Sequence, residues 1–168
     1  SELTIWSVFE TVLGSKRDQG GALVMEPLIA DAWETAADGS YTDFTIRKGI
    51  LFQHGWGELT AEDVALSYNS ANTSISPETI HDTGGDLAIV LDEATVLDTY
   101  TVRLPWKVFA GNSLPQYASD YWEGISIFSK KAFDELGDEE MRGTPIGSGP
   151  FLLTDYVQNK SVTLEAQD

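Results

Sequence analysis

Between Asp38 and Asn69, a segment with the period of a strand passes through two glycines into a segment with the period of a helix. The first half is apolar at alternate positions, which is typical of a strand with one buried face. These positions are Phe44, Ile46, Ile50 and Phe52. Gly49 interrupts the alternation and indicates a bulge, and the helical period starts only after Gly55 and Gly57. The fold must therefore accommodate a strand, a turn and a helix in that order.

The second half of the segment predicts a capped helix with one buried stripe. Its apolar residues are spaced by three and four positions: Ala61, Val64, Ala65 and Tyr68. Thr60 is placed to cap the helix, and Asp63, three residues on, approximates the second member of a capping box. Glu62 and Asp63 also lie at the positive end of the helix dipole. We therefore expect the strand and the helix to pack on the same core.

The other elements follow from the same two periods. Further strands are expected at 87–91, 95–97, 100–104, 125–128, and at the two arms of a hairpin, 151–157 and 161–165. Further helices are expected at 5–13, 114–122 and 130–141, the last capped by Ser129. Segment 23–34 indicates a short strand and then a turn of helix or a loop carrying Trp33, and 72–85 indicates a polar loop. Strands and helices mix without regular alternation, so the predicted class is α+β, with mixed, largely antiparallel sheets and packed helices.

The composition describes a folded and strongly acidic protein. Of the 168 residues, 42% are hydrophobic, and 5 Trp, 6 Tyr and 7 Phe supply material for a core. Ten Lys and Arg oppose 27 Asp and Glu, for a net charge of −17, so the surface repels phosphate backbones and no nucleic-acid partner is expected. There are no cysteines, which excludes disulfides, thiolate metal sites and a thiol nucleophile. No run of 18 apolar residues is present, and the first ten residues lack the pattern of a signal segment.

No residue set has the spacing of a catalytic or metal site, so neither an enzyme nor a cofactor is expected. The glycine-proline loop 143–150 lacks the Lys-Ser/Thr ending of a phosphate loop, and its prolines remove backbone donors, so it is interpreted as a rigid connection between sheets. His54 and His81 lie far apart in sequence and are expected in a turn and a loop. The acidic run 134–140 is interpreted as a solvated face, although two buried carboxylates in one cleft would permit an acidic hydrolase.

Aromatic residues are the candidates for contact with a ligand, because a Trp or Tyr ring offers a large contact area and one polar edge. Tyr117, Tyr121 and Trp122 cluster beside an expected loop. Trp6 is added as a more isolated candidate. The predicted ligand-binding residues are these four, with no catalytic and no metal-binding residue.

Three ordered motifs resemble the family 5 extracellular solute-binding proteins, the peptide, nickel and opine group that serves ABC importers. The motifs lie at 27–69, 96–107 and 144–165. The matching positions include Trp33, Asp38, Gly39, Phe44, Arg47, Phe52, Gly55, Thr60, Asp63, Gly147, Gly149 and Pro150. The sequence departs from the family pattern at Gln53-His54, where His-Asp is usual, at Ser148, where Thr is common, and by an extra residue near Trp56. The matched motifs are structural and carry no ligand-binding residues.

The resemblance implies a fragment of the first lobe of a two-lobed periplasmic-binding-protein fold. It divides the chain into edge elements of the main subdomain (1–35), an α+β subdomain often called Ib (36–143), and a glycine-proline loop with a hairpin returning to the main subdomain (144–168). The implied function is capture of a small solute, foremost a short peptide, for delivery to ABC permease subunits. The implied location is periplasmic or extracellular, including a lipid-anchored form, with the signal segment outside this sequence. The fragment alone is not expected to bind ligand.

One alternative from another class stays open. The same subdomain could serve as an independent interaction or sensory module that has lost transport. Saturable binding by the 168-residue chain alone would favour this alternative over solute capture.

Overall fold

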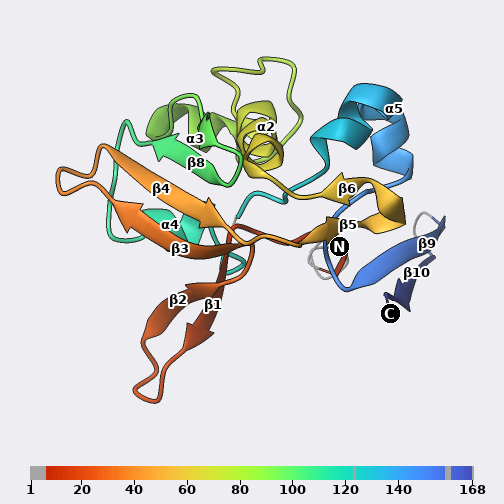
Figure 1. Cartoon of the computed structure of the whole chain (residues 1–168), viewed down its shortest axis with the longest axis horizontal. Helices are drawn as coiled ribbons and strands as arrows, with labels where there is room; N and C mark the ends of the chain where they lie inside the picture. The colour runs from red at the N-terminus through yellow and green to blue at the C-terminus, as the bar shows by residue number, and fades with distance from the viewer. Residues whose placement is uncertain (1–6, 123, 158–159, 168) are drawn as a thin grey trace.

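A four-stranded antiparallel sheet and the helix that packs against it form the centre of this computed structural model, which describes all residues except 1–6, 123, 158–159 and 168 (Figure 1). The sheet has the order β3 (Ala30–Thr35), β4 (Tyr41–Ile46), β8 (Thr101–Pro105) and β7 (Thr95–Asp98). Helix α2 (Ala61–Ala71) packs on β7 and β8. Mixed helices and antiparallel strand pairs confirm the predicted α+β class.

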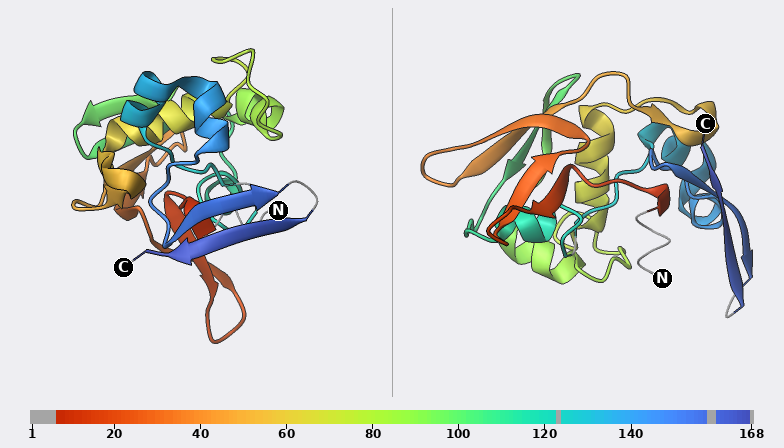
Figure 2. Two further views of the ribbon diagram at one scale, coloured as in Figure 1. Left: turned by 90° about the vertical axis from the view of Figure 1, so that its right-hand side faces the viewer. Right: turned by 90° about the horizontal axis from the view of Figure 1, so that it is seen from below.

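Three two-stranded antiparallel pairs surround this centre. They are β1 (Leu13–Arg17) with β2 (Leu23–Pro27), β5 (Leu51–Phe52) with β6 (Gly57–Glu58), and β9 (Phe151–Val157) with β10 (Ser161–Ala166). The remaining helical segments are η1 (Gln53–Gly55), α3 (Gly84–Val90), α4 (Ser113–Tyr117) and α5 (Lys130–Gly143). The β1–β2 hairpin projects downward from the body in Figure 1, whereas α5 and the β9–β10 hairpin lie at the right-hand end, away from the turn between β3 and β4 (Figures 1 and 2). Within the described part of the chain, none of the helices combines the length and the apolar character that a membrane crossing requires.

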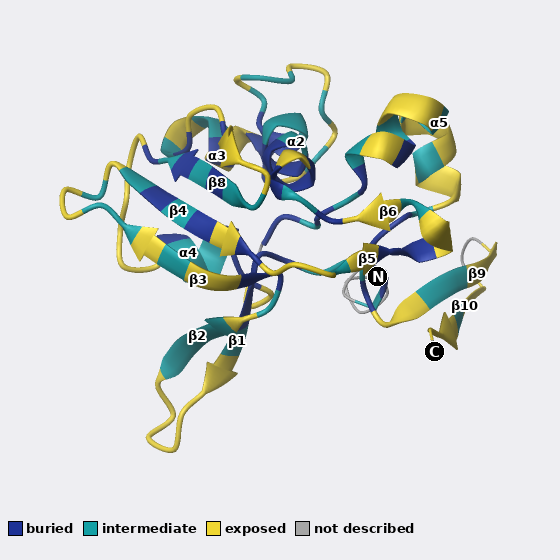
Figure 3. Ribbon diagram, viewed as in Figure 1, coloured by how far each residue is buried: buried dark blue, intermediate teal, exposed yellow. Residues whose placement is uncertain are grey.

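The core lies between β4, β8 and α2 (Figure 3). Alternate residues of β4 are buried, as the strand period predicts, and they meet the buried stripe of α2. The buried residues that meet here are Phe44, Ile46, Val64, Ala65, Tyr68, Val102 and Leu104. Trp33 is half-buried and packs against this core. The strand and the helix of the 38–69 segment therefore share one core, which confirms the expectation drawn from their periods.

The turn between strand and helix depends on left-handed backbone. His54 has φ 58°, and Gly55 and Gly57 have φ 74° and 105°, so the chain reverses between β5 and β6 within a few residues. Gly49 has φ 82° and lies in a turn between β4 and β5, where the sequence indicated a bulge. A glycine is favoured at these positions because L side chains rarely adopt positive φ.

Asp63 joins the first turns of two helices. One carboxylate oxygen accepts hydrogen bonds from the Thr60 backbone N–H at 2.7 Å and from its hydroxyl at 3.0 Å, which completes the predicted capping box. The other oxygen accepts from the backbone N–H of Lys130 at 2.8 Å, at the start of α5. Burial raises the pKa of Asp63, and the donated hydrogen bonds oppose that rise. The predicted Ser129 cap is also present, because its hydroxyl accepts from Ala132 N at 3.2 Å.

The side chain of Gln53 joins three parts of the chain that are far apart in sequence. Its Nε2 donates to the backbone carbonyls of Val8 at 3.3 Å, Gly149 at 2.9 Å and Phe151 at 2.8 Å. Its own backbone N–H donates to Gly147 O at 3.0 Å, and Gly149 N donates to Val8 O at 2.9 Å. We call these five residues the Gln53 junction. It fixes the N-terminal segment, the turn and the glycine-proline loop against one another.

Two helix predictions were too long. In the described part of 5–13 only residues 7–8 are helical, and Leu13 begins β1, because this backbone bonds to distant segments instead: Ile127 N donates to Glu10 O and Leu13 N donates to Ala118 O. Helix α4 ends at Tyr117, not at residue 122.

Two strand assignments and one assignment to a helical turn or loop were also wrong. Segment 87–91 lies mostly in helix α3, because a short apolar run does not distinguish a buried strand from a helix. Trp33 lies in strand β3, where the sequence indicated a turn of helix or a loop. Segment 125–128 belongs to no strand. The other expected strands and helix α5 are present, with Gly137 (φ 80°) kinking α5.

Gly147→Ala should destabilise the protein by about 3 kcal/mol, because the added methyl group overpacks a backbone contact. A Cβ at this position would lie 2.1 Å from Val8 O. At Gly111 a Cβ would meet nothing within 4 Å, so Gly111→Ala should change the free energy of unfolding by less than about 0.5 kcal/mol. Urea denaturation of both variants measures the difference, and equal stabilities would contradict the close packing of the junction.

Asp63→Asn should cost about 1–3 kcal/mol, because the amide nitrogen must replace one of two oxygens that both accept hydrogen bonds. Glu62→Gln is the matched control, since Glu62 is exposed on the same turn. Chemical denaturation at pH 7 compares the two variants. A loss no larger for Asp63→Asn than for Glu62→Gln would show that Asp63 does not join the helices.

Candidate functional site

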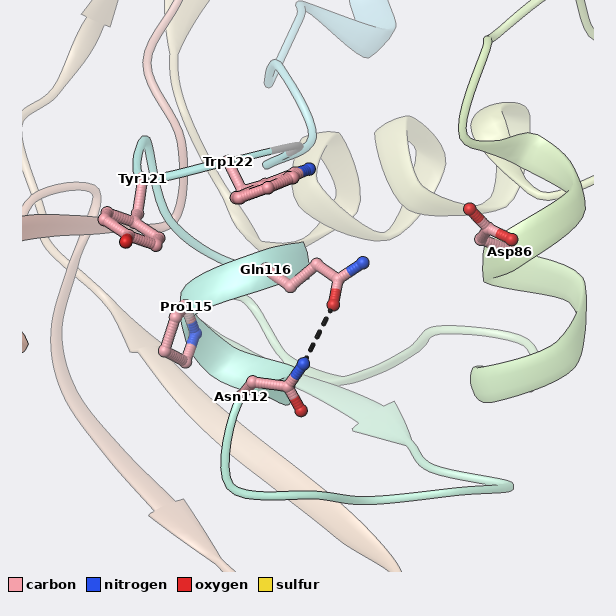
Figure 4. A pocket seen from close by; sticks show the side chains of 6 residues that line it. All are labelled: Asp86, Asn112, Pro115, Gln116, Tyr121 and Trp122. Carbon is pink, nitrogen blue, oxygen red and sulfur yellow. Dashed lines mark hydrogen bonds between the residues drawn. The ribbon is translucent and has the colours of Figure 1, made fainter.

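A surface hollow of about 360 Å³ contains two of the four predicted ligand-binding residues (Figure 4). We call it the aromatic hollow. It is lined by Asp86, Asn112, Pro115, Gln116, Tyr121 and Trp122. These side chains come from α3, from α4 with its N-cap, and from the loop that follows α4.

Local hydrogen bonds fix the floor and the aromatic wall of this hollow. Asn112, the N-cap of α4, donates from Nδ2 to Gln116 Oε1 at 3.1 Å, one helical turn later. Ser119 follows α4; its hydroxyl donates to Pro115 O at 2.8 Å and accepts from Tyr121 N at 3.2 Å. The end of the helix is thereby tied to the start of the aromatic pair. A short helix and one serine thus fix the backbone of Tyr121 relative to α4.

The two aromatic rings are open to solvent. The ring centroids of Tyr121 and Trp122 are 6.5 Å apart with an interplanar angle of 48°. Trp122 is 66% exposed and Tyr121 is 43% exposed, unusual values for such large rings. In Figure 4 the Trp122 ring lies between Tyr121 and Asp86. A ligand can therefore reach both rings without any rearrangement of the core.

The formal charge of the lining is negative. Asp86, in the first turn of α3, is the one ionisable acid or base among the lining residues apart from the Tyr121 phenol. Within the described residues its carboxylate has no hydrogen bond and no ion pair. The amides of Asn112 and Gln116 and the Trp122 N–H supply neutral polar groups. The hollow offers apolar contact, neutral polar groups and one unpaired carboxylate.

The other predicted ligand-binding residues lie elsewhere. Tyr117 is 7% exposed and packs in the core, where its backbone carbonyl accepts a hydrogen bond from Tyr68 Oη at 2.8 Å. Burial raises the pKa of Tyr68. Trp6 lies outside the described residues. The sequence analysis missed Asp86, Asn112, Pro115 and Gln116, for which the only signal was proximity of the last three to the aromatic cluster.

A second hollow, of about 740 Å³, lies between α2, the loop 72–83, segment 125–128 and α5. Its lining combines apolar rings with hydroxyl groups and charged side chains, among them Phe128, Phe133, Ser67, His81 and Arg142. His81 lies in the loop where the sequence placed it, and its Nδ1 lies 2.9 Å from the Thr83 hydroxyl. The sequence analysis did not predict this hollow, because its walls come from five separate segments, including Phe9 near the N-terminus.

The described residues show no arrangement suited to a metal ion: no group of three or more His, Asp or Glu has the required geometry there. The acidic run on α5 is exposed, as interpreted from the sequence, at Asp134, Glu135, Asp138, Glu139 and Glu140. Two of these carboxylates form ion pairs with Lys130 and Arg142 one turn away. This run therefore supplies no buried pair of acids for hydrolysis.

Comparison with protein families gives a match over most of the chain. The profile described as "Bacterial extracellular solute-binding proteins, family 5 Middle" matches residues 24–168. This range contains all three motifs that carry the resemblance found in the sequence.

Characterised relatives match at lower identity and are much longer. A heme-binding protein A of Haemophilus influenzae is 26% identical over 165 residues, which cover 88% of this chain and 29% of that protein. A dipeptide-binding protein of Escherichia coli is 26% identical over 166 residues, covering 88% of this chain and 30% of that protein. This chain thus spans less than a third of the length of either relative.

Solved structures have the same fold. A periplasmic binding protein, MoaA, from A. tumefaciens R10 in complex with mannopinic acid superposes with a TM-score of 0.80 at 25% identity, over 98% of this chain and 32% of that one. The oligopeptide-binding protein AppA of Bacillus subtilis, in complex with a nonapeptide, gives 0.76 at 25% identity, over 97% and 31%. These matches confirm the expected fold, a part of a two-lobed periplasmic binding protein.

Trp122→Ala should leave the free energy of unfolding within about 0.5 kcal/mol of wild type, because the ring is exposed. Tyr117→Ala should cost about 3 kcal/mol, since it empties a buried aromatic position. Urea denaturation of the two variants compares them directly. A large loss for Trp122→Ala would mean that this ring is part of the core and not of an accessible hollow.

Proposed function

This chain belongs to family 5 of the bacterial extracellular solute-binding proteins, and we propose that it works in the capture of a solute for an ABC importer. The observation that carries the proposal is the family match across residues 24–168. Proteins of this family are solute-binding proteins and not enzymes, so this chain would act by binding its solute and not by catalysing a reaction. Closure of two lobes around a solute would bury it between apolar walls and a few polar groups.

The proposed solute is a short peptide. A relative named for dipeptides and a structure containing a nonapeptide support this choice. A relative named for heme and a structure containing mannopinic acid show how far ligands differ among similar proteins. Tyr121 and Trp122 remain the proposed contact residues on this chain, because their rings are open to solvent and both line the aromatic hollow. The permease subunits of the importer are the proposed protein partners, and the proposed location is periplasmic or extracellular.

We also propose that the expected division at 1–35, 36–143 and 144–168 describes how this chain enters a larger protein. The Gln53 junction supports it, since residues of the first and third segments meet there through Val8, Gly147 and Gly149. The first and last segments would then belong to one subdomain, with the central segment inserted between them.

Isothermal titration of the full-length protein that contains this chain with di-, tri- and tetrapeptides tests the proposed function. Saturable binding of at least one peptide class is expected. Absence of binding to every peptide, together with binding of an unrelated solute, would contradict the peptide assignment.

The 168-residue chain alone should show a change of melting temperature below about 1 °C with millimolar peptide, because a ligand stabilises only a state that binds it. The proposed two-lobed site would need surfaces from the remainder of the full-length protein. Differential scanning fluorimetry of the chain and of the full-length protein makes the comparison. A shift of several degrees for the chain alone would favour an independent binding module.

A further inference from the structure

We propose that the aromatic hollow binds the basic side chain of a peptide, with its ammonium or guanidinium group between the Trp122 ring and the Asp86 carboxylate. The group is a lysine or arginine side chain, carried either by a peptide solute or by a segment of a protein partner. Only the first of these sources rests on the proposed function.

The charge of the hollow selects against anions and favours cations. Asp86 is the one charged side chain of the lining, and no Lys or Arg lines the hollow to neutralise it. Lys107 follows β8 by two residues, and its Nζ donates to the backbone carbonyl of Ala88, in α3, at 3.1 Å. The net charge of −17 adds a long-range attraction for cations. An anionic group in the hollow would be repelled both by the Asp86 carboxylate and by the net negative charge of the protein.

The open face of the Trp122 ring supplies the second contribution to cation binding. A cation within about 6 Å of a Trp ring is attracted by the negative face of the ring, and Trp is the best residue for this interaction. Trp122 is the most exposed of the described large aromatic side chains, at 66%, and Tyr121 packs beside it at a centroid distance of 6.5 Å. Elsewhere in the chain, aromatic faces are already occupied by cations: Arg103 lies 3.5 Å from the Tyr41 centroid, and Lys48 lies 4.9 Å from that of Tyr100.

The geometry suits a long basic side chain and not a bare ion. The hollow has room for several methylene groups, at about 360 Å³, and Pro115 and the two rings provide apolar contact for them. The linked amides of Asn112 and Gln116 lie on the floor, where they can bond to the peptide backbone. Lysine and arginine have this combination of an apolar stem and a charged end.

The test uses NMR titration of the ¹⁵N-labelled chain with Nα-acetyl-lysine methylamide and with its norleucine analogue, which lacks the ammonium group. In wild type and Asp86→Asn, binding is followed by the chemical shift of the Trp122 indole N–H. In Trp122→Leu, which lacks this group, it is followed by the chemical shift of the Gln116 backbone N–H. Glu93→Gln is the matched control, because it removes one exposed carboxylate away from the hollow.

Both compounds should bind the isolated chain weakly, too weakly to raise its melting temperature by more than about 1 °C at millimolar concentration. The lysine compound should bind about three- to tenfold more tightly than the norleucine compound, the range for one exposed cation–π contact and one screened carboxylate. Asp86→Asn and Trp122→Leu should each remove most of this preference, and Glu93→Gln should keep it within about twofold. Raising the salt concentration should weaken binding of the lysine compound alone. Equal binding of the two compounds, or an equal loss in Glu93→Gln and Asp86→Asn, overturns the cation site.

A second arm assigns the source of the cation in the full-length protein, using Ala-Lys-Ala and Ala-norleucine-Ala. A preference for the lysine peptide that disappears in Trp122→Leu supports a peptide solute in the hollow. Peptide binding without such a preference overturns the solute as the source. If neither tripeptide binds, the result counts against the peptide assignment of the proposed function, while the titration of the isolated chain still decides the cation site by itself.

Discussion

The amide of Gln53 is the interaction on which the arrangement of the chain depends. It lies fully buried at the end of β5 and donates to three backbone carbonyls that belong to segments at the two ends of the sequence. Gly147 and Gly149 allow this approach, because a Cβ at either position would lie within 2.1 to 2.7 Å of the backbone at Ser7 and Val8. The glycine-proline loop is thus a close backbone contact, which explains why it contains glycine at both positions.

Asp63 extends this arrangement to the helices. The segment that begins with β4 ends in α2. The Asp63 carboxylate, which caps α2, also accepts a hydrogen bond from the first N–H of α5. Ser67 adds a second connection, since its hydroxyl accepts from Phe128 N at 3.1 Å. The family motifs in this chain therefore hold segments together. The aromatic hollow lies outside both connections, so its lining residues take no part in holding these segments together.

The sequence predicted those features of the fold that depend on residues close together in the chain. The capping box of Thr60 and Asp63, the alternation of β4 and the Ser129 cap are all present, because each depends on residues a few positions apart. The helix expected at 5–13 is absent beyond residue 8, since distant carbonyls and N–H groups bind that backbone. The role of Gln53 and the contribution of Asp86 to the hollow arise from contacts across many residues, and no local pattern indicates either one. The aromatic cluster predicted Tyr121 and Trp122, which line the hollow, but it could not show that Tyr117 points into the core.

Native-state hydrogen exchange of two backbone N–H groups tests the Gln53 junction most directly. Gln53 N donates to Gly147 O at 3.0 Å, and Gly149 N donates to Val8 O at 2.9 Å. If the junction holds the ends of the chain together, both should exchange only through global unfolding, with the same opening free energy as the N–H groups in the middle of α2. Exchange of either group through a local opening, at a free energy several kcal/mol below that of α2, would contradict the account.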